Sequence, residues 1–170
     1  MSAARPHIAI LGMMGVGKTT VGSALAAGLG RRHVDSDHDI GLLTGMSGRA
    51  FAAENGVDSL HELEAAVLLG ALAAAEPAVI SAAASTFEYR LVRQLLPGRA
   101  VVVRLTLGID DTLKRQAEGG HRRPMDREEL EALARRREPF FIELEDLRIA
   151  ADRSPAELVD QIAAFVASDQ

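Results

Sequence analysis

Residues 7–19 read HIAILGMMGVGKT, and this stretch decides the class of fold. The apolar run from His7 to Leu11 predicts a short buried strand that stops at Gly12. The next eight residues, Gly12 to Thr19, match the pattern G-x-x-x-x-G-K-[ST]. Apolar residues at helical spacing then predict a helix over 19–29. A phosphate-binding loop requires this placement after a strand and before a helix, so the stretch predicts a nucleotide-binding α/β protein.

The glycines and the lysine of this loop have separate physical roles. The glycines allow the backbone to curl so that successive N–H groups point at phosphate oxygens, and the following helix adds its positive end. Lys18 is expected to reach the β- and γ-phosphates of ATP, and the Thr19 hydroxyl to hold Mg²⁺. The alternative is a glycine-rich turn with a chance lysine, but four specified positions seldom coincide by accident. The loop residues expected to bind ATP are Gly12, Gly15, Val16, Gly17, Lys18, Thr19 and Thr20.

The composition indicates one globular domain over residues 1–170, because 48% of the residues are hydrophobic and 25% are charged. The net charge of -5 argues against a nucleic-acid groove, which needs a concentrated cationic surface. There are no cysteines for disulfides or thiolate metal sites. The sequence shows no bilayer-spanning stretch and no signal peptide, so we expect a cytoplasmic protein without membrane partners.

Short apolar runs alternate with helical patterns along the rest of the chain. The expected strands are residues 7–11, 33–35, 78–81, 100–105 and 148–151. The expected later helices are residues 60–68, 91–96, 130–140 and 156–166. Pro139 is expected to interrupt the third of these helices, and Ser154 to cap the last with Pro155 in its first turn. The alternation predicts βαβ units and a parallel sheet covered by helices on both faces.

Two carboxylates, Asp35 and Asp37, follow the second expected strand. The carboxyl edge of an open parallel sheet is where ligands gather. Because the two residues are two apart, their side chains would point the same way in extended geometry. One could face a Mg²⁺ ion while the other orients an acceptor hydroxyl and takes its proton. The alternative for Asp37 is that it caps a helix beginning near His38.

Five motifs occur in a characteristic order: GMMGVGKTTVG, DSD, LTGMS, HRRP and the REPFF stretch from Arg137. With these motifs the chain resembles the shikimate kinase family over nearly its whole length. The phosphate loop is shared by many families, and it is the DSD with the later R-P and R-x-P that narrows the choice. The resemblance implies a three-layer α/β/α P-loop NTPase fold, with a five-stranded parallel sheet in the order 2-3-1-4-5 and a short lid at about 116–126. It also implies phosphoryl transfer from ATP to the 3-hydroxyl of shikimate, a step of aromatic amino-acid biosynthesis.

The resemblance also implies roles for single residues. Asp35 would lie near Mg²⁺, and Asp37 would contact the hydroxyls of the acceptor. Arg123 would be a lid arginine that neutralises the phosphates, Arg115 would lie against the adenine, and Arg137 would bind the carboxylate of the acceptor. The expected catalytic residues are therefore Lys18, Asp37 and Arg123. The expected metal ligands are Thr19 and Asp35, and the expected acceptor-binding residues are Asp37, His61, Ala82, Ala83, Ala84 and Arg137.

Two departures from the family pattern fall on the acceptor side. His61 stands where the family has an arginine that binds the shikimate carboxylate. An arginine is always charged and can bind a carboxylate bidentately, whereas an ordinary histidine is mostly neutral at pH 7, and losing such a contact costs about 1.5–3 kcal/mol. Ala82, Ala83 and Ala84 replace three glycines; their methyl groups narrow the pocket, and alanine would be strained by about 1 kcal/mol wherever φ is positive. The motifs on the ATP side are intact.

The departures leave three hypotheses open. The default is a shikimate kinase, and the second is a related kinase for a different small hydroxylated acceptor. The third is an ATP-binding regulatory homologue without catalysis. It predicts erosion of Lys18, Thr19, Asp35 or the lid arginine Arg123, and none is eroded. A nucleoside monophosphate kinase would need more arginines around the second phosphate. The sequence does not identify the acceptor, and we take a monomer as the default without excluding oligomers.

Overall fold

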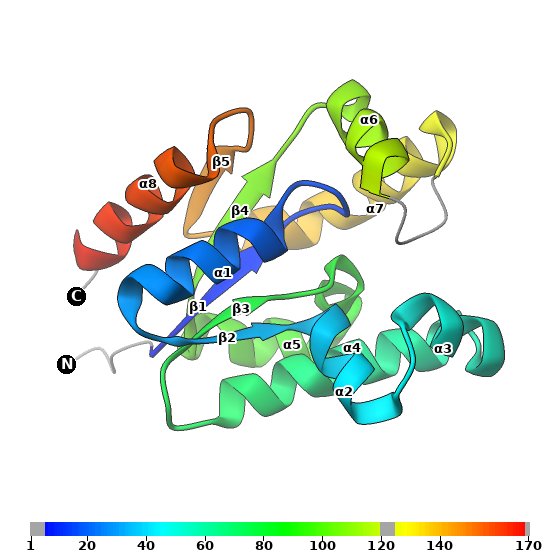
Figure 1. Ribbon diagram of the computed structural model, residues 1–170, viewed down its shortest axis with the longest axis horizontal. Helices are drawn as coiled ribbons and strands as arrows, with labels where there is room; N and C mark the ends of the chain where they lie inside the picture. The colour runs from blue at the N-terminus through cyan, green and yellow to red at the C-terminus, as the bar shows by residue number, and fades with distance from the viewer. Residues whose placement is uncertain (1–5, 120–124, 169–170) are drawn as a thin grey trace.

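The computed structural model describes residues 6–119 and 125–168, which form a parallel sheet between two helical layers (Figure 1). The sheet has five strands in the order β2-β3-β1-β4-β5, which confirms the expected order. The strands are β1 (His7–Leu11), β2 (Arg32–Asp35), β3 (Ala78–Ser81), β4 (Ala100–Thr106) and β5 (Leu147–Ala150). The expected strands are all present. The inner strands β1, β3 and β4 are apolar runs buried between the two layers, whereas the edge strands β2 and β5 are partly exposed.

The helices are α1 (Lys18–Leu29), α2 (Ser36–Thr44), α3 (Gly48–Asn55), α4 (Val57–Ala73), α5 (Arg90–Leu95), α6 (Ile109–Gly119), α7 (Arg127–Leu144) and α8 (Pro155–Ser168). Two 3₁₀ turns, η1 (Ala84–Glu88) and η2 (Leu96–Gly98), flank α5. The expected interruption at Pro139 is wrong, because α7 continues through it to Leu144. Phe141 and Leu144 pack into the core beyond the proline, and this burial holds the helix together across the missing N–H donor.

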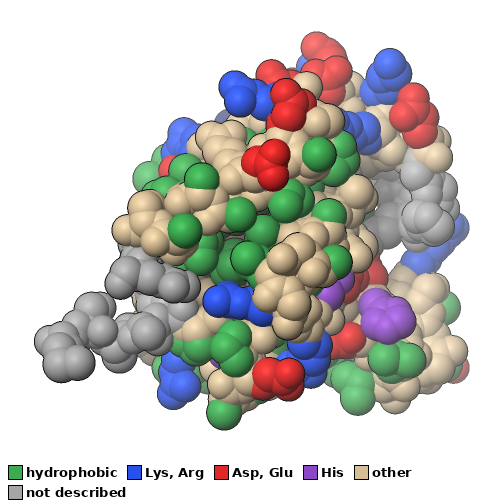
Figure 2. All heavy atoms as spheres, turned by 60° about the vertical axis from the view of Figure 1, so that its left-hand side comes forward, with side chains coloured by type: hydrophobic (Ala, Val, Ile, Leu, Met, Phe, Trp, Pro, Cys, Tyr) green, Lys and Arg blue, Asp and Glu red, His purple; other side chains and the backbone are tan. Residues whose placement is uncertain are grey.

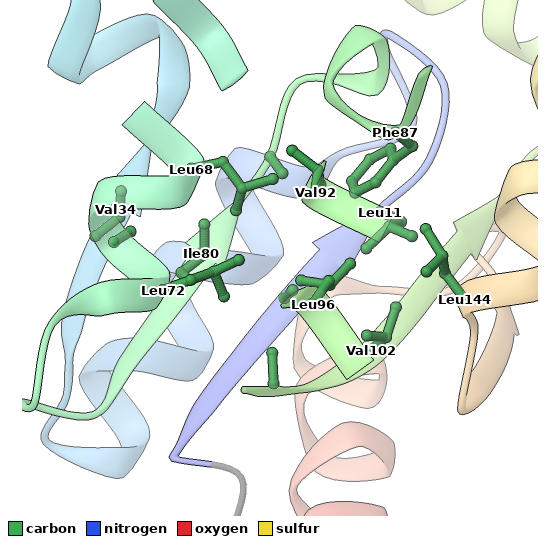
Figure 3. Packing of buried hydrophobic residues seen from close by; sticks show 14 of the residues in the cluster. Leu11, Val34, Leu68, Leu72, Ile80, Phe87, Val92, Leu96, Val102 and Leu144 are labelled. Carbon is green, nitrogen blue, oxygen red and sulfur yellow. The ribbon is translucent and has the colours of Figure 1, made fainter. Parts of the chain in front are cut away.

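Alternate residues of each central strand enter different cores. Ile8 and Ile10 of β1 pack toward α1 and α8, whereas Ala9 and Leu11 pack toward α4, α5 and α7. Figure 3 shows the second of these cores, in which Leu11 lies among side chains from the neighbouring strands and the covering helices. In the same core the rings of Phe87 and Phe141 meet edge to face, with centroids 5.8 Å apart.

The parallel topology brings the carboxyl ends of the strands to one edge of the sheet. β1 leads there into the phosphate loop, β2 into α2, and β3 into η1. At this end of the molecule α2 and α3 lie on one side and α6 on the other (Figure 1). The residues that the sequence singled out therefore come from separate segments to the same edge.

The surface mixes charges of both signs. On the face that Figure 2 shows, Lys and Arg side chains are scattered among Asp and Glu side chains, with apolar groups between them. In the parts of the chain that the structure describes, no helix has the length and apolar character needed to cross a membrane.

Candidate active site

The phosphate loop between β1 and α1 adopts a conformation that only glycine accepts at its key positions. Gly12 has φ 145° and Gly17 has φ 104°. A Cβ atom on Gly12 would also lie 2.5 Å from the carbonyl oxygen of Leu105, which is closer than any real contact. Gly17 is the N-cap of α1, so the loop ends directly at the positive end of that helix.

Lys18 joins the loop to the sheet behind it. Its Nζ donates to the carbonyl oxygens of Gly12 at 2.9 Å and Met13 at 3.1 Å. Its own carbonyl oxygen accepts a hydrogen bond of 2.9 Å from the Ser81 hydroxyl, which lies 2.9 Å from Nε2 of His33. Because the Ser81 hydroxyl donates its one hydrogen to Lys18, it accepts from His33. Burial lowers the pKa of His33, although the charge of Asp35 opposes the shift.

Asp35 connects the phosphate loop to α2. Its Oδ2 accepts a hydrogen bond of 2.6 Å from the Thr19 hydroxyl, and its Oδ1 accepts from the backbone N–H groups of Asp37 at 3.1 Å and His38 at 3.2 Å. Asp35 is thus the N-cap of α2, and the alternative that Asp37 caps this helix is wrong. The extended geometry expected for the pair is also wrong. The strand ends at Asp35, and Asp37 lies in the first turn of α2.

Thr19 and Asp35 offer the oxygen atoms expected to hold Mg²⁺. Hydroxyl and carboxylate oxygens are suitable ligands, and Mg²⁺ usually takes few ligands from the protein and the rest from phosphates and water. Among residues 6–119 and 125–168, no group of three or more His, Asp or Glu side chains could hold a metal ion. The pair therefore fits a Mg²⁺ ion that binds chiefly through the nucleotide.

One cavity of about 530 Å³ extends from the phosphate loop to the acceptor side. Lys18 and Thr19 line one end of it. The side chains lining the rest include Asp35, Asp37, Arg49, His61, Glu64, Ser85 and Arg137, together with Ala82, Ala83 and Ala84. The structure thus brings together every residue expected to bind the acceptor, and their individual roles stay predictions.

The three alanines at this cavity are accommodated without backbone strain. No described residue other than glycine has a positive φ, and Ala83 has φ -63° and ψ 138°. The N–H of Ala82 donates to the carbonyl oxygen of Ile10 at 3.3 Å, and the N–H of Ala83 donates to the hydroxyl oxygen of Ser36 at 3.2 Å. The strain considered from the sequence is therefore absent, and only the volume of the methyl groups distinguishes these alanines from glycine.

Arg137 on α7 is buried, with 6% of its surface exposed. Its Nε donates to Oε1 of Glu88 at 2.8 Å, and the same oxygen accepts a bond of 2.8 Å from Arg136. Burial lowers the pKa of Arg137, and the Glu88 carboxylate opposes this shift. Burial raises the pKa of Glu88, but the two arginines outweigh it, so the net shift is downward. Glu88 thus fixes Arg137 at the cavity wall by one edge of its guanidinium.

Several residues that line this cavity are absent from the set expected from the sequence. Glu64 on α4 is buried and accepts a hydrogen bond from the Ser85 hydroxyl. Its place three residues after His61 on one helix was a usable signal, because such residues share a face. Arg49 gave no signal, since the segment around α3 has no clear apolar period.

Several expected ATP-binding residues do not line the cavity. Val16 is buried in the core beneath the loop, and the side chain of Thr20 is exposed on α1. Arg115 on α6 donates to the carbonyl oxygens of Val16 at 3.1 Å and Ala151 at 2.9 Å, so it ties α6 to the loop and to the end of β5. Arg123 lies outside the described residues, as do residues 120–124 of the expected lid.

The fold and the site together define a P-loop protein of the small-molecule kinase class. A sequence model of the family described as "Shikimate kinase" matches residues 14–167. The chain therefore belongs to the shikimate kinase family, whose members are ATP-dependent small-molecule kinases.

Individual relatives agree with this assignment. Shikimate kinase from Baumannia cicadellinicola is 34% identical over 160 residues, which cover 90% of this chain and 91% of that protein. Shikimate kinase from Acinetobacter baumannii, solved in complex with shikimate, matches with a TM-score of 0.87 and 27% identity over 97% of this chain and 94% of that one. A gluconokinase from Sinorhizobium meliloti, at 20% identity and a TM-score of 0.58, shares the fold.

Proposed function

We propose that this protein transfers the γ-phosphoryl group of ATP to the 3-hydroxyl of shikimate. The observation that carries the proposal is the single cavity that Lys18 and Thr19 share with Asp37 and Arg137. A donor bound at the phosphate loop and an acceptor bound near Asp37 would lie in the same space. Membership of the shikimate kinase family supports this donor and this acceptor.

The phosphate loop would hold the triphosphate by its backbone N–H groups and by the positive end of α1. Lys18 now donates to two loop carbonyls, and its ammonium group would turn to the β- and γ-phosphates. Mg²⁺ held at Thr19 and Asp35 would supply positive charge to the phosphate oxygens. Arg123 as a further phosphate ligand stays a prediction from the sequence.

The transfer itself needs little covalent chemistry from the protein. The hydroxyl oxygen of the acceptor forms a bond to the γ-phosphorus while the bond to the bridging β-γ oxygen breaks, and ADP leaves with the electron pair. Asp37 would orient the hydroxyl and accept its proton. Arg137 would contact the carboxylate of shikimate through its Nη atoms, because Glu88 occupies its Nε. We place this reaction in the cytoplasm, where the sequence predicts the protein to be.

A different hydroxylated acceptor is the second candidate function. It is favoured by one observation, which is that His61 and the three alanines do line the cavity. A side chain without a permanent charge at position 61 and a narrower wall at positions 82–84 would both weaken the binding of shikimate. Small hydroxy acids and polyols other than shikimate would then be the substrates.

The test is the rate of ADP release from ATP–Mg²⁺ with and without shikimate, with the Lys18→Ala variant as the blank. We expect release that depends on shikimate and lies well above the blank. No stimulation by shikimate would contradict the proposal. A panel of hydroxy acids and polyols would then separate a different acceptor from the non-catalytic regulatory role, in which ATP binds and no acceptor stimulates turnover.

A further inference from the structure

Two arginines line the acceptor side of the cavity among the described residues, and their surroundings differ. Arg137 is buried, and its Nε is bonded to Glu88. Arg49 is exposed and makes no hydrogen bond or ion pair with any described residue, although it lines the same cavity. Its guanidinium is therefore available to a bound ligand.

The first turn of α3 lies directly beside Asp37. A Cβ atom on Gly48 would lie 3.6 Å from Oδ1 of Asp37, so the backbone just before Arg49 lies close to the expected proton acceptor. Ala52, three residues after Arg49 on the same helix, also lines the cavity, so one face of α3 borders it. Ser47 caps this helix by accepting from the N–H of Ala50 at 3.2 Å, which fixes the turn that carries Arg49. In Figure 1 α3 stands beside α2 and α4 at this end of the molecule.

The charges around the acceptor space favour a further cation beside Arg137. Asp37 and Glu64 place two carboxylates on this side of the cavity, and both would repel an anionic acceptor. His61 carries no permanent charge, whereas an arginine is charged at every physiological pH. Apart from Arg49, Arg137 is the one arginine that lines the cavity among the described residues, and one edge of its guanidinium is already bonded to Glu88.

We propose that Arg49 binds the carboxylate of the acceptor and, with Arg137, makes the site specific for anionic acceptors. This inference rests on the proposed function. It assigns to α3 a carboxylate contact that the family pattern makes from an arginine at the position of His61. Arg49 acts on binding and on the choice of acceptor, because phosphoryl transfer takes place at the hydroxyl beside Asp37.

The test compares Arg49→Ala and Arg49→Lys with the wild-type protein, using shikimate and its uncharged carboxamide as acceptors. Arg32→Ala is the matched control, because Arg32 is also exposed but begins β2 at the opposite edge of the sheet. For Arg49→Ala we expect a KM for shikimate about tenfold higher, which is the lower end of the range for a hydrogen bond to a charged group, because this side chain is exposed. Its kcat and its KM for ATP should stay at the wild-type values. Arg49→Lys should retain part of the affinity, and Arg32→Ala should match the wild type.

The carboxamide separates a charge contact from a general loss of fit. We expect Arg49→Ala to leave turnover of the carboxamide unchanged. Three outcomes for Arg49→Ala would each overturn the inference while the proposed function stands. They are an equal loss of turnover with both acceptors, a rise in the KM for ATP, and an unchanged KM for shikimate. If the wild-type protein turned over no shikimate, the proposed function would fail. Calorimetric titration with shikimate would then decide the inference. Weaker binding of shikimate to Arg49→Ala than to the wild type would support it. Equal binding to both proteins, or no binding to the wild type, would overturn it.

Discussion

Replacing Gly22 by alanine tests how closely the helix after the phosphate loop must approach the sheet. A Cβ atom there would lie 2.2 Å from the Ser81 hydroxyl oxygen and 2.7 Å from Nε2 of His33. The Ser81 hydroxyl cannot turn away without losing its bond to the Lys18 carbonyl and its contact with His33. A lost hydrogen bond costs about 0.5–1.5 kcal/mol and overpacking about 1–3 kcal/mol, so we expect a packing cost of about 2–3 kcal/mol.

Gly28→Ala is the matched control in the same helix, because no atom lies within 4 Å of a Cβ at that position. Alanine is favoured over glycine in a helix by about 0.8–1 kcal/mol, and comparing the two variants largely cancels this gain. For a chain of this size 1 kcal/mol shifts the melting temperature by about 2–4 °C. Thermal unfolding should therefore show Gly22→Ala melting about 4–12 °C below Gly28→Ala. Equal melting temperatures would refute the packing argument.

Three further changes probe the site. His61→Arg adds a permanent cation to the cavity and should lower the KM for shikimate about tenfold; an unchanged KM would show that position 61 does not reach the carboxylate. Asp35→Asn should raise the Mg²⁺ concentration for half-maximal activity about tenfold. The melting temperature should change little, because asparagine also caps helices. An unaltered Mg²⁺ requirement would show that Asp35 is not a metal ligand. The pKa of Glu88 is lowered from its ordinary value of 4.5, so its carboxylate stabilises the fold above that pH and this contribution is lost as the pH falls through the lowered value. Glu88→Gln should accordingly cost about 1–2 kcal/mol of unfolding free energy at pH 7 and little in strong acid; melting curves that differ equally at both pH values would contradict this reasoning.

The sheet and the phosphate loop could be predicted from the sequence because each rests on a local pattern. A strand such as Ala78–Ser81 is a continuous apolar run, since both faces of the sheet are covered. The loop needs glycine wherever φ is positive, and Gly12 and Gly17 stand at such positions. The helices α2 and α3 were not predicted in full because their burial is slight: Leu42 and Leu43 of α2 are exposed, and the only buried residue of α3 is Gly48.

Most residues of the site were predicted from the sequence, but the hydrogen bonds that hold them were not. The residues of the DSD motif were expected at the edge of the sheet, but the sequence could not show that the helix begins at once, which makes Asp35 its cap. The bond of Arg137 to Glu88 joins residues that are far apart in the chain and follow no periodic pattern. Arg49 entered only when the tertiary fold set α3 against the cavity. Contacts of this kind depend on packing between elements, which local patterns do not encode.

The most direct measurement is the identity of the phosphorylated product. The wild-type protein is incubated with ATP, Mg²⁺ and shikimate, and the mixture is followed by ³¹P NMR with proton coupling. We predict a new phosphomonoester signal coupled to the ring proton at C3, growing in step with ADP and absent with Lys18→Ala. A mixture in which ADP appears only with inorganic phosphate, or in which ATP stays intact, would contradict phosphoryl transfer to shikimate.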